Sequence, residues 1–526
     1  MENLIPGLGE RPAPTMAGHT IYLIERDRTT VPSTSNQGNT VFRIRLYESE
    51  VQHDRRMRTP IREQGQFPFM LLLECCFPMA YIVPFRALRY DSQRVSPSAV
   101  VTQPYDKITP KMQDGYYAAS PYNLVRLILG KREEQDDEKR NVYTRAADFF
   151  QDWRRQGVFL QDPQPSLYAY SQSFTVPGTT KLAERRGFIA LGRIEDYAAN
   201  VVFRHEQTLA KPKADRLDLL RATRAHFGQI FMLYNDSGEI DGLLTQSVPP
   251  FTEITDEYGV VNRLWRVSDP GLIDLVRGKM RDKKLIIADG HHRYETALNY
   301  RNERRTLTTQ PVGAPRKRIG GTLLRSIEAE DAPYELAMMT FVNMNNPGLV
   351  ILPTHRVVHS LATFDPATFL SAARKYFNVE EVDPSVDAAR ATAILREAGH
   401  VGTTFIAATA SRVFLLHTPK AAPSVFGGLS IRQQFLDVVQ LHKVVLEGVL
   451  ELSEESIRNQ QNLSYVRDAA EALNTVRGGD ANVAFLMNPC RMEQVRDIAF
   501  AGEVLPQKST DFFPKLLSGL TIYALE

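Results

Sequence analysis

The sequence predicts a mixed α/β protein, because short apolar runs typical of buried strands alternate with stretches of helical spacing. The chain has 526 residues, of which 43% are hydrophobic and 24% are charged, as in ordinary globular proteins. This composition excludes wholesale disorder, a collagen-like chain and a multi-span membrane protein. At about 150 residues per domain, the length predicts two or three domains.

The first half of the pattern begins with a β-rich stretch at 79–90 and a turn-rich stretch at 102–106. Helical spacing and apolar β-like runs then alternate: we expect helices at 124–129, 145–155 and 215–226, and strands at 167–170, 187–191 and 230–234. Residues 235–282 carry Pro249, Pro250 and Pro270 and show weaker patterning. We expect this stretch to be an insertion or excursion.

The second half opens with the strongest signal, an apolar strand at 285–288, a glycine turn and a helix. A loop is expected at 311–315. We then expect helices at 367–376, 388–398, 433–450 and 465–476, and strands at 403–408, 412–417 and 482–487. The change of pattern near residue 362 predicts an N-terminal α/β domain at 79–362 and a C-terminal α/β domain at 363–526.

Residues 1–78 differ from the rest and are expected to be a non-native or disordered extension. There is no lysine before Met79, and no helical or strand periodicity is sustained. The apolar stretch at 67–77 is about half as long as a membrane span and contains Glu74, so we expect neither a membrane anchor nor a signal peptide. We expect native translation to begin at Met79.

Charge and cysteine content narrow the class of partner. The chain has 63 Lys and Arg against 61 Asp and Glu, a net charge of +2, which argues against a major role in binding nucleic acid or acidic lipid. Only three cysteines occur, Cys75, Cys76 and Cys490, too few for a disulfide framework, so we expect a cytoplasmic protein. A small-molecule substrate is the expected partner.

The turn after the strand at 285–288 carries the densest chemistry. Asp289, Gly290, His291, His292 and Arg293 gather where a helix N-terminus leaves N–H groups unpaired and carries partial positive charge. Arg293 offers a forked contact to phosphate oxygens, and Asp289 can hold a metal ion or orient a histidine. The alternative is that Asp289 merely caps the helix and the histidines are surface groups. We favour an anion site.

Two further constellations are candidates. His205 and Glu206 precede Arg216, so that Glu206 can act as a general base and Arg216 can attract phosphate; a solvated charged face is the alternative. Near the C-terminus, Lys508, Ser509 and Thr510 can touch an anionic substrate, or the segment can be a structural clamp. The familiar Walker, dinucleotide, zinc-protease and serine-hydrolase motifs are absent from the sequence.

These motifs together resemble the Domain of Unknown Function 1015 family of bacterial and archaeal proteins. The matching pieces lie at 81–86, 103–106, 205–208, 215–216, 288–294, 352–356, 441–443 and 506–510. They span residues 79–526, and the family name implies no activity.

A more distant resemblance implies a function. The order of His205-Glu206, an arginine-bearing helix and the turn at 289–293 is similar to the core of the sulfiredoxin and ParB superfamily, especially its free-serine kinases. That resemblance implies that Gly290, His291, His292 and Arg293 hold nucleotide phosphates and that Glu206 is the base on the serine hydroxyl. It also implies ATP or ADP and Mg²⁺ as cofactors, and Asp289 and His292 join Glu206 as candidate catalytic residues.

We therefore expect a phosphoryl-transfer enzyme acting on a small hydroxylated metabolite, with free serine as one candidate. In phosphoryl transfer, catalysis comes mostly from positioning the reactants and neutralising the charge on the phosphoryl group. An anion-binding turn and a base suit this chemistry. A phosphatase of a compound such as phosphoserine is the enzymatic alternative. The alternative from another class is a nucleotide-sensing regulator or a ParB-like DNA-binding protein.

Overall fold

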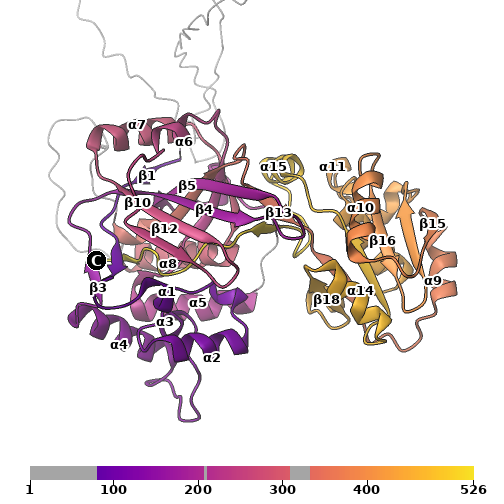
Figure 1. The fold of residues 1–526 in the computed structure, drawn as a ribbon, viewed down its shortest axis with the longest axis horizontal. Coiled ribbons are helices and arrows are strands. Elements are labelled where there is room, and N and C mark those ends of the chain that lie inside the picture. The colour runs from indigo at the N-terminus through magenta and orange to yellow at the C-terminus, as the bar shows by residue number, and fades with distance from the viewer. Residues whose placement is uncertain (1–79, 207–209, 309–331) are drawn as a thin grey trace, which may run out of the picture. The chain divides into compact units, whose positions relative to one another are not determined.

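The computed structural model of the protein describes residues 80–206, 210–308 and 332–526. Within these residues, nine strands form a larger sheet and six form a second sheet, with helices packed on both (Figure 1). The expectation of a mixed α/β fold is therefore confirmed. The expected extension at 1–78, the start at Met79, two of the three cysteines and the loop at 311–315 lie outside the described residues.

The larger sheet mixes parallel and antiparallel pairs, in the order β6-β11-β8-β12-β5-β4-β10-β9, with β1 beside β5. Only the β6–β11 and β8–β12 pairs are parallel among the described strands. The strand bounds are β1 Ile82–Val83, β4 Leu167–Thr175, β5 Leu182–Arg193, β6 Val202–Phe203, β8 Ile230–Tyr234, β9 Thr252–Thr255, β10 Val261–Val267, β11 Leu285–Asp289 and β12 Leu336–Asn343.

The central strands of this sheet are apolar throughout because both of their faces are covered. Every residue of β8 and β12 is buried. Alternate residues of β8 enter two different cores: Met232 packs with helices α6 (Glu239–Leu243), α7 (Pro270–Met280) and α8 (His291–Thr308), whereas Phe231 packs with Phe512 and Leu516 of the C-terminal segment. The C-terminal segment is thus part of the core.

A separate helical core lies beside this sheet. Its helices are α1 Pro97–Val100, α2 Pro110–Ala119, α3 Val125–Ile128 and α4 Val142–Arg155, which appear in indigo and purple in Figure 1. Trp153 and Phe150 of α4 pack against Phe159 of strand β3 (Phe159–Gln161), which pairs with β2 (Leu88–Tyr90). Tyr105, between α1 and α2, packs against the same core.

The stretch at 235–282 is not an excursion, and that expectation was wrong. It forms α6, β9, β10 and α7, and β10 pairs with β4 over seven residues. The prolines misled because they lie at element boundaries: Pro249 and Pro250 precede β9, and Pro270 occupies the first turn of α7, where it fits well.

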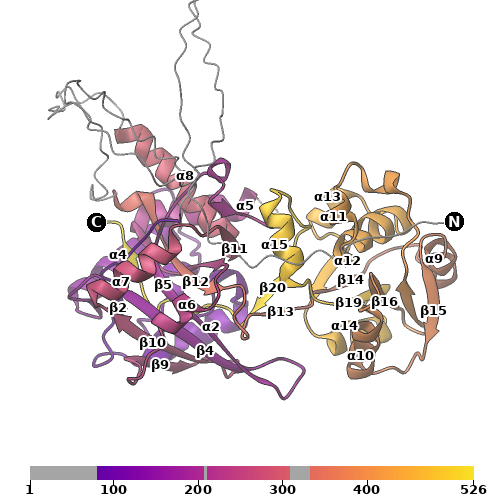
Figure 2. The ribbon, with the colours of Figure 1, turned by 90° about the horizontal axis from the view of Figure 1, so that it is seen from above.

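The second sheet is antiparallel, in the order β15-β17-β16-β19-β14-β18. Helices α10 (Ala388–Ala398) and α14 (Ala469–Arg477) cover one face, and α9 (Pro366–Ala373), α12 (Asp437–Gln440) and a π-helix (Leu441–Val449) cover the other (Figure 2). The strand bounds are β14 His355–Val358, β15 Asn378–Val382, β16 Thr404–Ala408, β17 Val413–His417, β18 Leu463–Val466 and β19 Val483–Met487.

Two expected helices of this part differ in the structure. The stretch at 433–450 is divided into α11 (Ile431–Gln434), α12 and the π-helix. The helix expected at 465–476 begins only at Ala469, because residues 463–466 form β18 and Asp468 then caps the helix through the N–H groups of Ala470 and Glu471.

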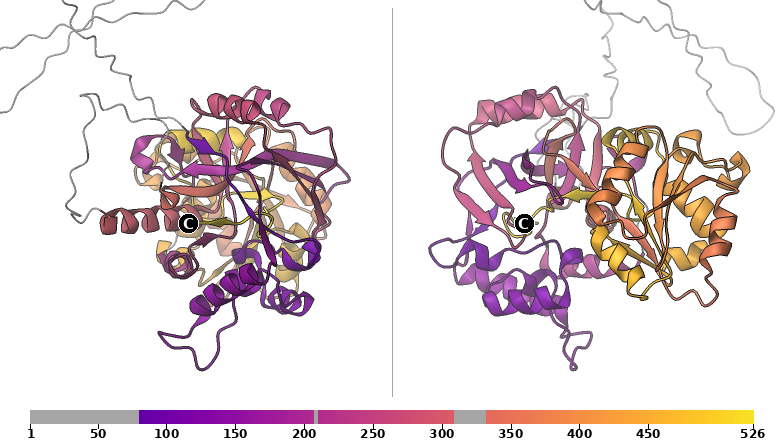
Figure 3. Two further views of the ribbon diagram at one scale, coloured as in Figure 1. Left: turned by 90° about the vertical axis from the view of Figure 1, so that its left-hand side faces the viewer. Right: turned by 45° about the vertical axis from the view of Figure 1, so that its right-hand side comes forward.

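The C-terminal segment returns to the larger sheet. Strand β20 (Asp511–Phe513) pairs with β13 (Val350–Leu352), and β21 (Tyr523–Ala524) pairs with β7 (Ala225–His226). Figure 3 shows this yellow segment among the indigo and magenta elements. Strand β14 already belongs to the second sheet, so the chain passes between the two sheets more than once. The domain ranges 79–362 and 363–526 therefore remain a prediction. Across the described ranges, no helix has the length and apolar character that a membrane span needs.

Close approach of two strands makes a test of this packing. A methyl group at Gly187 on β5 would lie 2.3 Å from the carbonyl oxygen of Phe341 on β12, so Gly187→Ala forces these strands apart. We expect the free energy of unfolding to fall by about 1–3 kcal/mol, measured by chemical denaturation. The matched control is Gly115→Ala in α2, where no atom lies within 4 Å and alanine favours the helix. Equal stability of Gly187→Ala and wild type would contradict the register.

Candidate functional site

The parallel pairing of β6 with β11 brings two of the candidate constellations together. Val202 pairs with Leu285 and Phe203 with Ile286, so the carboxyl ends of both strands lie at the same edge of the sheet. His205 and Glu206 follow β6, and Asp289 ends β11. The 82 residues between Glu206 and Asp289 therefore leave the edge and return to it.

Gly290 shapes the turn between β11 and α8. Its φ is +89°, and an added methyl group would lie 3.0 Å from the guanidinium of Arg293. This space lets Arg293 fold back onto the strand: its Nη2 donates to Asp289 Oδ2 at 2.8 Å, and its Nη1 donates to the Gln229 carbonyl. Within the described residues these bonds leave Arg293 three further N–H groups for an anion.

Asp289 is held from its other side by Lys515 of the C-terminal segment. Lys515 Nζ lies 3.2 Å from Asp289 Oδ1 and 3.0 Å from Asp511 Oδ1, and Arg467 Nη2 donates to Asp511 at 2.8 Å. Burial would raise the pKa of Asp289, but Lys515, Arg293 and Lys107 lower it far below its usual range. Burial lowers the pKa of Lys515, yet Asp289 and Asp511 hold it above its usual value. Asp289 and Lys515 are therefore charged at neutral pH.

Cations outnumber carboxylates around this turn. Burial and the neighbouring Lys515 and Lys508 lower the pKa of Lys107, so Lys107 lies in a positive field. Arg185 is almost fully buried, stacks over Phe231 at 4.7 Å and donates to the Phe513 carbonyl at 3.2 Å. A group of cations with too few carboxylates attracts an anion, and it does so strongly where burial limits screening.

A pocket opens beside the turn, and two arginines from different helices line it. Arg216 comes from α5 (Ala210–Thr223) and lies 4.2 Å over the ring of Tyr105, and Arg293 comes from α8. Thr296 also lines the pocket, and its buried hydroxyl has no hydrogen-bond partner in the described parts of the chain. The remaining lining residues are Pro104, Ile128, Leu219, Leu220, Ala225, His226, Phe227, Gly228 and Ser518.

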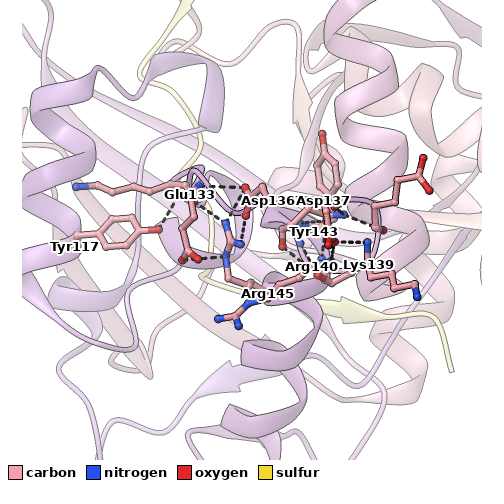
Figure 4. Close-up of polar contacts among 12 residues, drawn as sticks. Tyr117, Glu133, Asp136, Asp137, Lys139, Arg140, Tyr143 and Arg145 are labelled. Atoms are coloured by element: carbon pink, nitrogen blue, oxygen red, sulfur yellow. Dashed lines mark hydrogen bonds and ion pairs between the residues drawn. The ribbon is translucent and has the colours of Figure 1, made fainter.

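The first turn of α4 holds Arg216 in place through Tyr143. Tyr143 Oη donates to Asp215 Oδ1 at 2.8 Å, and Asp215 in turn accepts from Arg216 Nε at 2.8 Å. Figure 4 shows how the loop before α4 is closed: Arg145 bonds Asp136 and the carbonyl of Lys131, while the side chain of Asn141 caps α4. Arg216 still has two N–H groups that no described residue accepts.

Glu206 and His205 are joined by Thr510. The N–H and the hydroxyl of Thr510 lie 2.8 Å and 2.7 Å from Glu206 Oε1. His205 is fully buried, with Nδ1 2.8 Å from the Ile287 carbonyl oxygen and Nε2 2.7 Å from Thr510 Oγ1. Burial lowers the pKa of His205, so the ring is neutral at physiological pH.

The other candidate residues are placed as follows. His291 is buried with its ring 4.9 Å from that of His205, and burial lowers its pKa well below the usual range. His292 is half-buried at the start of α8. Ser509 donates to the Pro506 carbonyl at 2.6 Å, whereas Lys508 is exposed and its carbonyl accepts from Arg356 at 3.1 Å. The roles assigned to these residues from the sequence remain predictions.

The structure adds residues that the sequence did not single out. Tyr105 and Lys107 lie at the Gln-Pro-Tyr-Asp piece at 103–106, which carried no assigned role. Lys515 stands in the C-terminal stretch that was expected to contact an anion or act as a clamp. Thr296 gave no signal, because threonine within a helix is common and only packing shows that its hydroxyl lacks a partner.

A second hollow lies elsewhere on the larger sheet. Strands β4, β5 and β10 line it together with α6, through residues that include Arg186, Asp241, Arg263 and Trp265. It shares no lining residue with the pocket beside the turn. Of the candidate site residues singled out from the sequence, Arg216 and Arg293 line the smaller hollow.

The residues at the turn do not fit a magnesium site built by the chain alone. Each carboxylate oxygen of Asp289 already contacts a cation, Lys515 or Arg293. Elsewhere in the described ranges, no three His, Cys, Asp or Glu side chains gather as metal ligands. Asp289 therefore orients the side chains of Arg293 and Lys515. No chemical step is assigned to a metal.

Residues 82–439 match the family described as "Protein of unknown function (DUF1015)". The chain belongs to this family. The match includes the edge formed by β6 and β11, whereas the pieces at 441–443 and 506–510 lie beyond it. No curated protein matches the sequence.

Solved structures offer a weak likeness. A conserved hypothetical protein from Pyrococcus furiosus is 12% identical over 62% of this chain and 92% of its own, with a TM-score of 0.30. A free serine kinase in complex with AMP is 12% identical over 59% of this chain and 83% of its own, at 0.29. SbnI from Staphylococcus aureus is 9% identical over 63% of this chain and 85% of its own, at 0.29. A likeness this weak assigns no residue and no activity.

Lys515 provides a test of the charge network. Lys515→Met keeps the length of the side chain but leaves Asp289 and Asp511 short of one cation, so we expect the free energy of unfolding to fall by about 3–5 kcal/mol at neutral pH. The lowered pKa of Asp289 and Asp511 stabilises the folded wild type above pH about 4, and this contribution is lost as pH falls through the folded pKa values.

The deficit of Lys515→Met should therefore shrink below pH about 4, as urea denaturation at several pH values can measure. The control is Lys131→Met, which breaks an exposed pair with Asp114 and an exposed contact with the ring of Tyr117 and should cost about 1 kcal/mol. A deficit of Lys515→Met that stays constant with pH would contradict the pairing.

Proposed function

We propose that this protein is a phosphoryl-transfer enzyme that binds a nucleotide or another phosphate compound at the turn of residues 289–293 and acts on a small hydroxylated metabolite. The observation that carries the proposal is that Arg216 and Arg293, from different helices, line one pocket beside a group of cations with too few carboxylates. Phosphate oxygens supply the missing negative charge, and the N-terminus of α8 faces the same region.

Each group at the edge has a role in this chemistry. The spare N–H groups of Arg216 and Arg293 bind phosphate oxygens, and Lys107 and Lys515 neutralise the charge that spreads over the transferring group. Tyr105 and the Thr296 hydroxyl offer an aromatic surface and a hydrogen bond to the remainder of the phosphate compound. Glu206 Oε2, which no described residue contacts, takes the proton of the attacking hydroxyl.

Free serine is the substrate that the motif resemblance favours. A phosphatase of phosphoserine needs the same phosphate contacts, with water in place of the second substrate, and therefore differs only in what Glu206 activates. A regulator or ParB-like DNA-binding protein needs the nucleotide site but no base. The balance of 63 basic against 61 acidic residues weakens the DNA reading.

Phosphate binding is tested by Arg293→Ala. Loss of a charge-assisted contact should weaken nucleotide or phosphate affinity by about 1.5–3 kcal/mol, as isothermal titration calorimetry can measure. Arg293→Lys should restore only part of the lost affinity, because a point charge does not reproduce the forked contact. The ligand for this titration is chosen beforehand by a thermal-shift screen of nucleotides and phosphorylated amino acids. A ligand at 100 times its dissociation constant stabilises the wild type by about 2.7 kcal/mol, which such a screen detects.

The matched control is Arg155→Ala on α4, whose side chain is 77% exposed and does not line the pocket. It should bind the same probe as tightly as wild type. If Arg293→Ala folds and binds with wild-type affinity, the anion site is not at this turn.

The base is tested by Glu206→Gln. The amide keeps the shape of the side chain and removes its basicity, so turnover should fall by about 100-fold to 10,000-fold while nucleotide affinity is retained. Steady-state kinetics with ATP and serine measures the turnover, and calorimetry measures the nucleotide affinity. Glu454→Gln, on the exposed start of α13 (Glu454–Arg458), is the control. Full turnover in Glu206→Gln would leave the regulator or an alternative base as the better explanation.

A further inference from the structure

Three contacts in a row join β11, β6 and the C-terminal segment. The Ile287 carbonyl lies 2.8 Å from His205 Nδ1, His205 Nε2 lies 2.7 Å from Thr510 Oγ1, and Thr510 Oγ1 lies 2.7 Å from Glu206 Oε1. All three distances are within hydrogen-bond range. Each contact therefore needs one hydrogen between its two atoms.

The groups in this row do not carry enough hydrogens for all three contacts. The Ile287 carbonyl can only accept, so a neutral His205 must place its single hydrogen on Nδ1. His205 Nε2 is then a bare lone pair, and an ionised Glu206 is also only an acceptor. The hydroxyl hydrogen of Thr510 is left with two acceptors, one on each side.

We propose that the hydroxyl of Thr510 is a two-position switch, which donates to Glu206 when that carboxylate is ionised and to His205 when Glu206 carries a proton. This proposal rests on the proposed role of Glu206 as the base. The backbone N–H of Thr510 keeps Oε1 in place in both states, so only the hydroxyl hydrogen moves. Thr510 and His205 are positioning residues, since neither takes the proton.

The switch matters for the strength of the base. When the substrate O–H bond breaks, its proton goes to Glu206 Oε2, and Oε1 becomes a weaker acceptor. Without His205, the Thr510 hydroxyl would then have only this weaker acceptor, and that loss would oppose protonation of Glu206. With His205 present, the hydrogen turns to Nε2 and keeps a full hydrogen bond. No bond within Thr510 or His205 breaks.

The surroundings keep His205 neutral, as the switch requires. His205 is fully buried, and burial lowers its pKa despite the opposing effect of Glu206 and Asp289. The ring of His291 packs against it at 4.9 Å, and burial keeps that histidine neutral as well. Among the described residues, the titratable or charged groups whose pKa the charge of Glu206 raises are His205, Arg356, Tyr465 and Cys490.

The ¹⁵N resonances of His205 test the switch without any need for activity. In the full-length wild type labelled with ¹⁵N-histidine, we expect a neutral ring at pH 7 and a shift of the Nε2 resonance as Glu206 titrates, because the lone pair gains a donor. Thr510→Ser keeps the hydroxyl and should keep this response. Thr510→Val keeps the shape and should abolish it, and Glu206→Gln should abolish it as well.

Kinetics supplies a second readout that a merely structural role would not move. In Thr510→Val, Glu206 loses one donor to its ionised form, so the acid limb of the kcat pH profile should move to higher pH by about one to two pH units. Thr510→Ser should return the limb to the wild-type position. Thr392→Val on α10, which removes an exposed hydroxyl that donates to the Ala388 carbonyl, should leave the limb unchanged.

Two results would overturn the switch. One is an imidazolium signal from His205 at pH 7, because a doubly protonated ring already supplies the third hydrogen. The other is an Nε2 response of the same size in wild type and Thr510→Val. If the wild type transfers no phosphoryl group but the Nε2 response disappears in Thr510→Val, the enzymatic proposal fails and the switch stands.

Discussion

Lys515 holds the site together, because it is the cation that the half-buried carboxylate of Asp289 and the buried carboxylate of Asp511 share. Its ammonium group lies 3.2 Å from Asp289 and 3.0 Å from Asp511, which belong to strands of different sheets. A buried carboxylate without a cation would be too costly to keep ionised. The pairing therefore fixes the C-terminal segment against the end of β11, and Thr510 and Ser518 take their places beside the turn as a consequence.

The second constraint is the parallel register of β6 and β11. Parallel strands must be joined by a crossover, and this crossover contains α5, β8, β10 and α7. The long separation between Glu206 and Asp289 is thus what a parallel pair requires. The crossover also supplies Arg216 from α5 and Gly228 before β8, so the chain that separates the two motifs builds the pocket beside them.

The division of roles between arginines follows from their partners. Arg216 and Arg293 each bind a carboxylate and a carbonyl, line one pocket and retain further N–H groups. This arrangement suits the reversible binding of an anion. Arg185 and Arg356 are buried and bond to carbonyl oxygens of the C-terminal segment, which suits a structural clamp. The clamp interpretation therefore describes part of that segment, and its contact with a ligand stays a prediction.

The sequence by itself determined the mixed α/β class, strand β8, and the strand and helix around Gly290, because local periodicity and glycine conformation are encoded in neighbouring residues. It misjudged residues 235–282, since prolines at element boundaries look the same as prolines in a loop. Only the tertiary structure decided that Glu206 and Asp289 share an edge, that Lys515 pairs with Asp289 and that Thr510 lies between Glu206 and His205. These contacts join residues from 83 to 305 positions apart, and strand pairing and buried charge select such partners, which no local pattern in the sequence records.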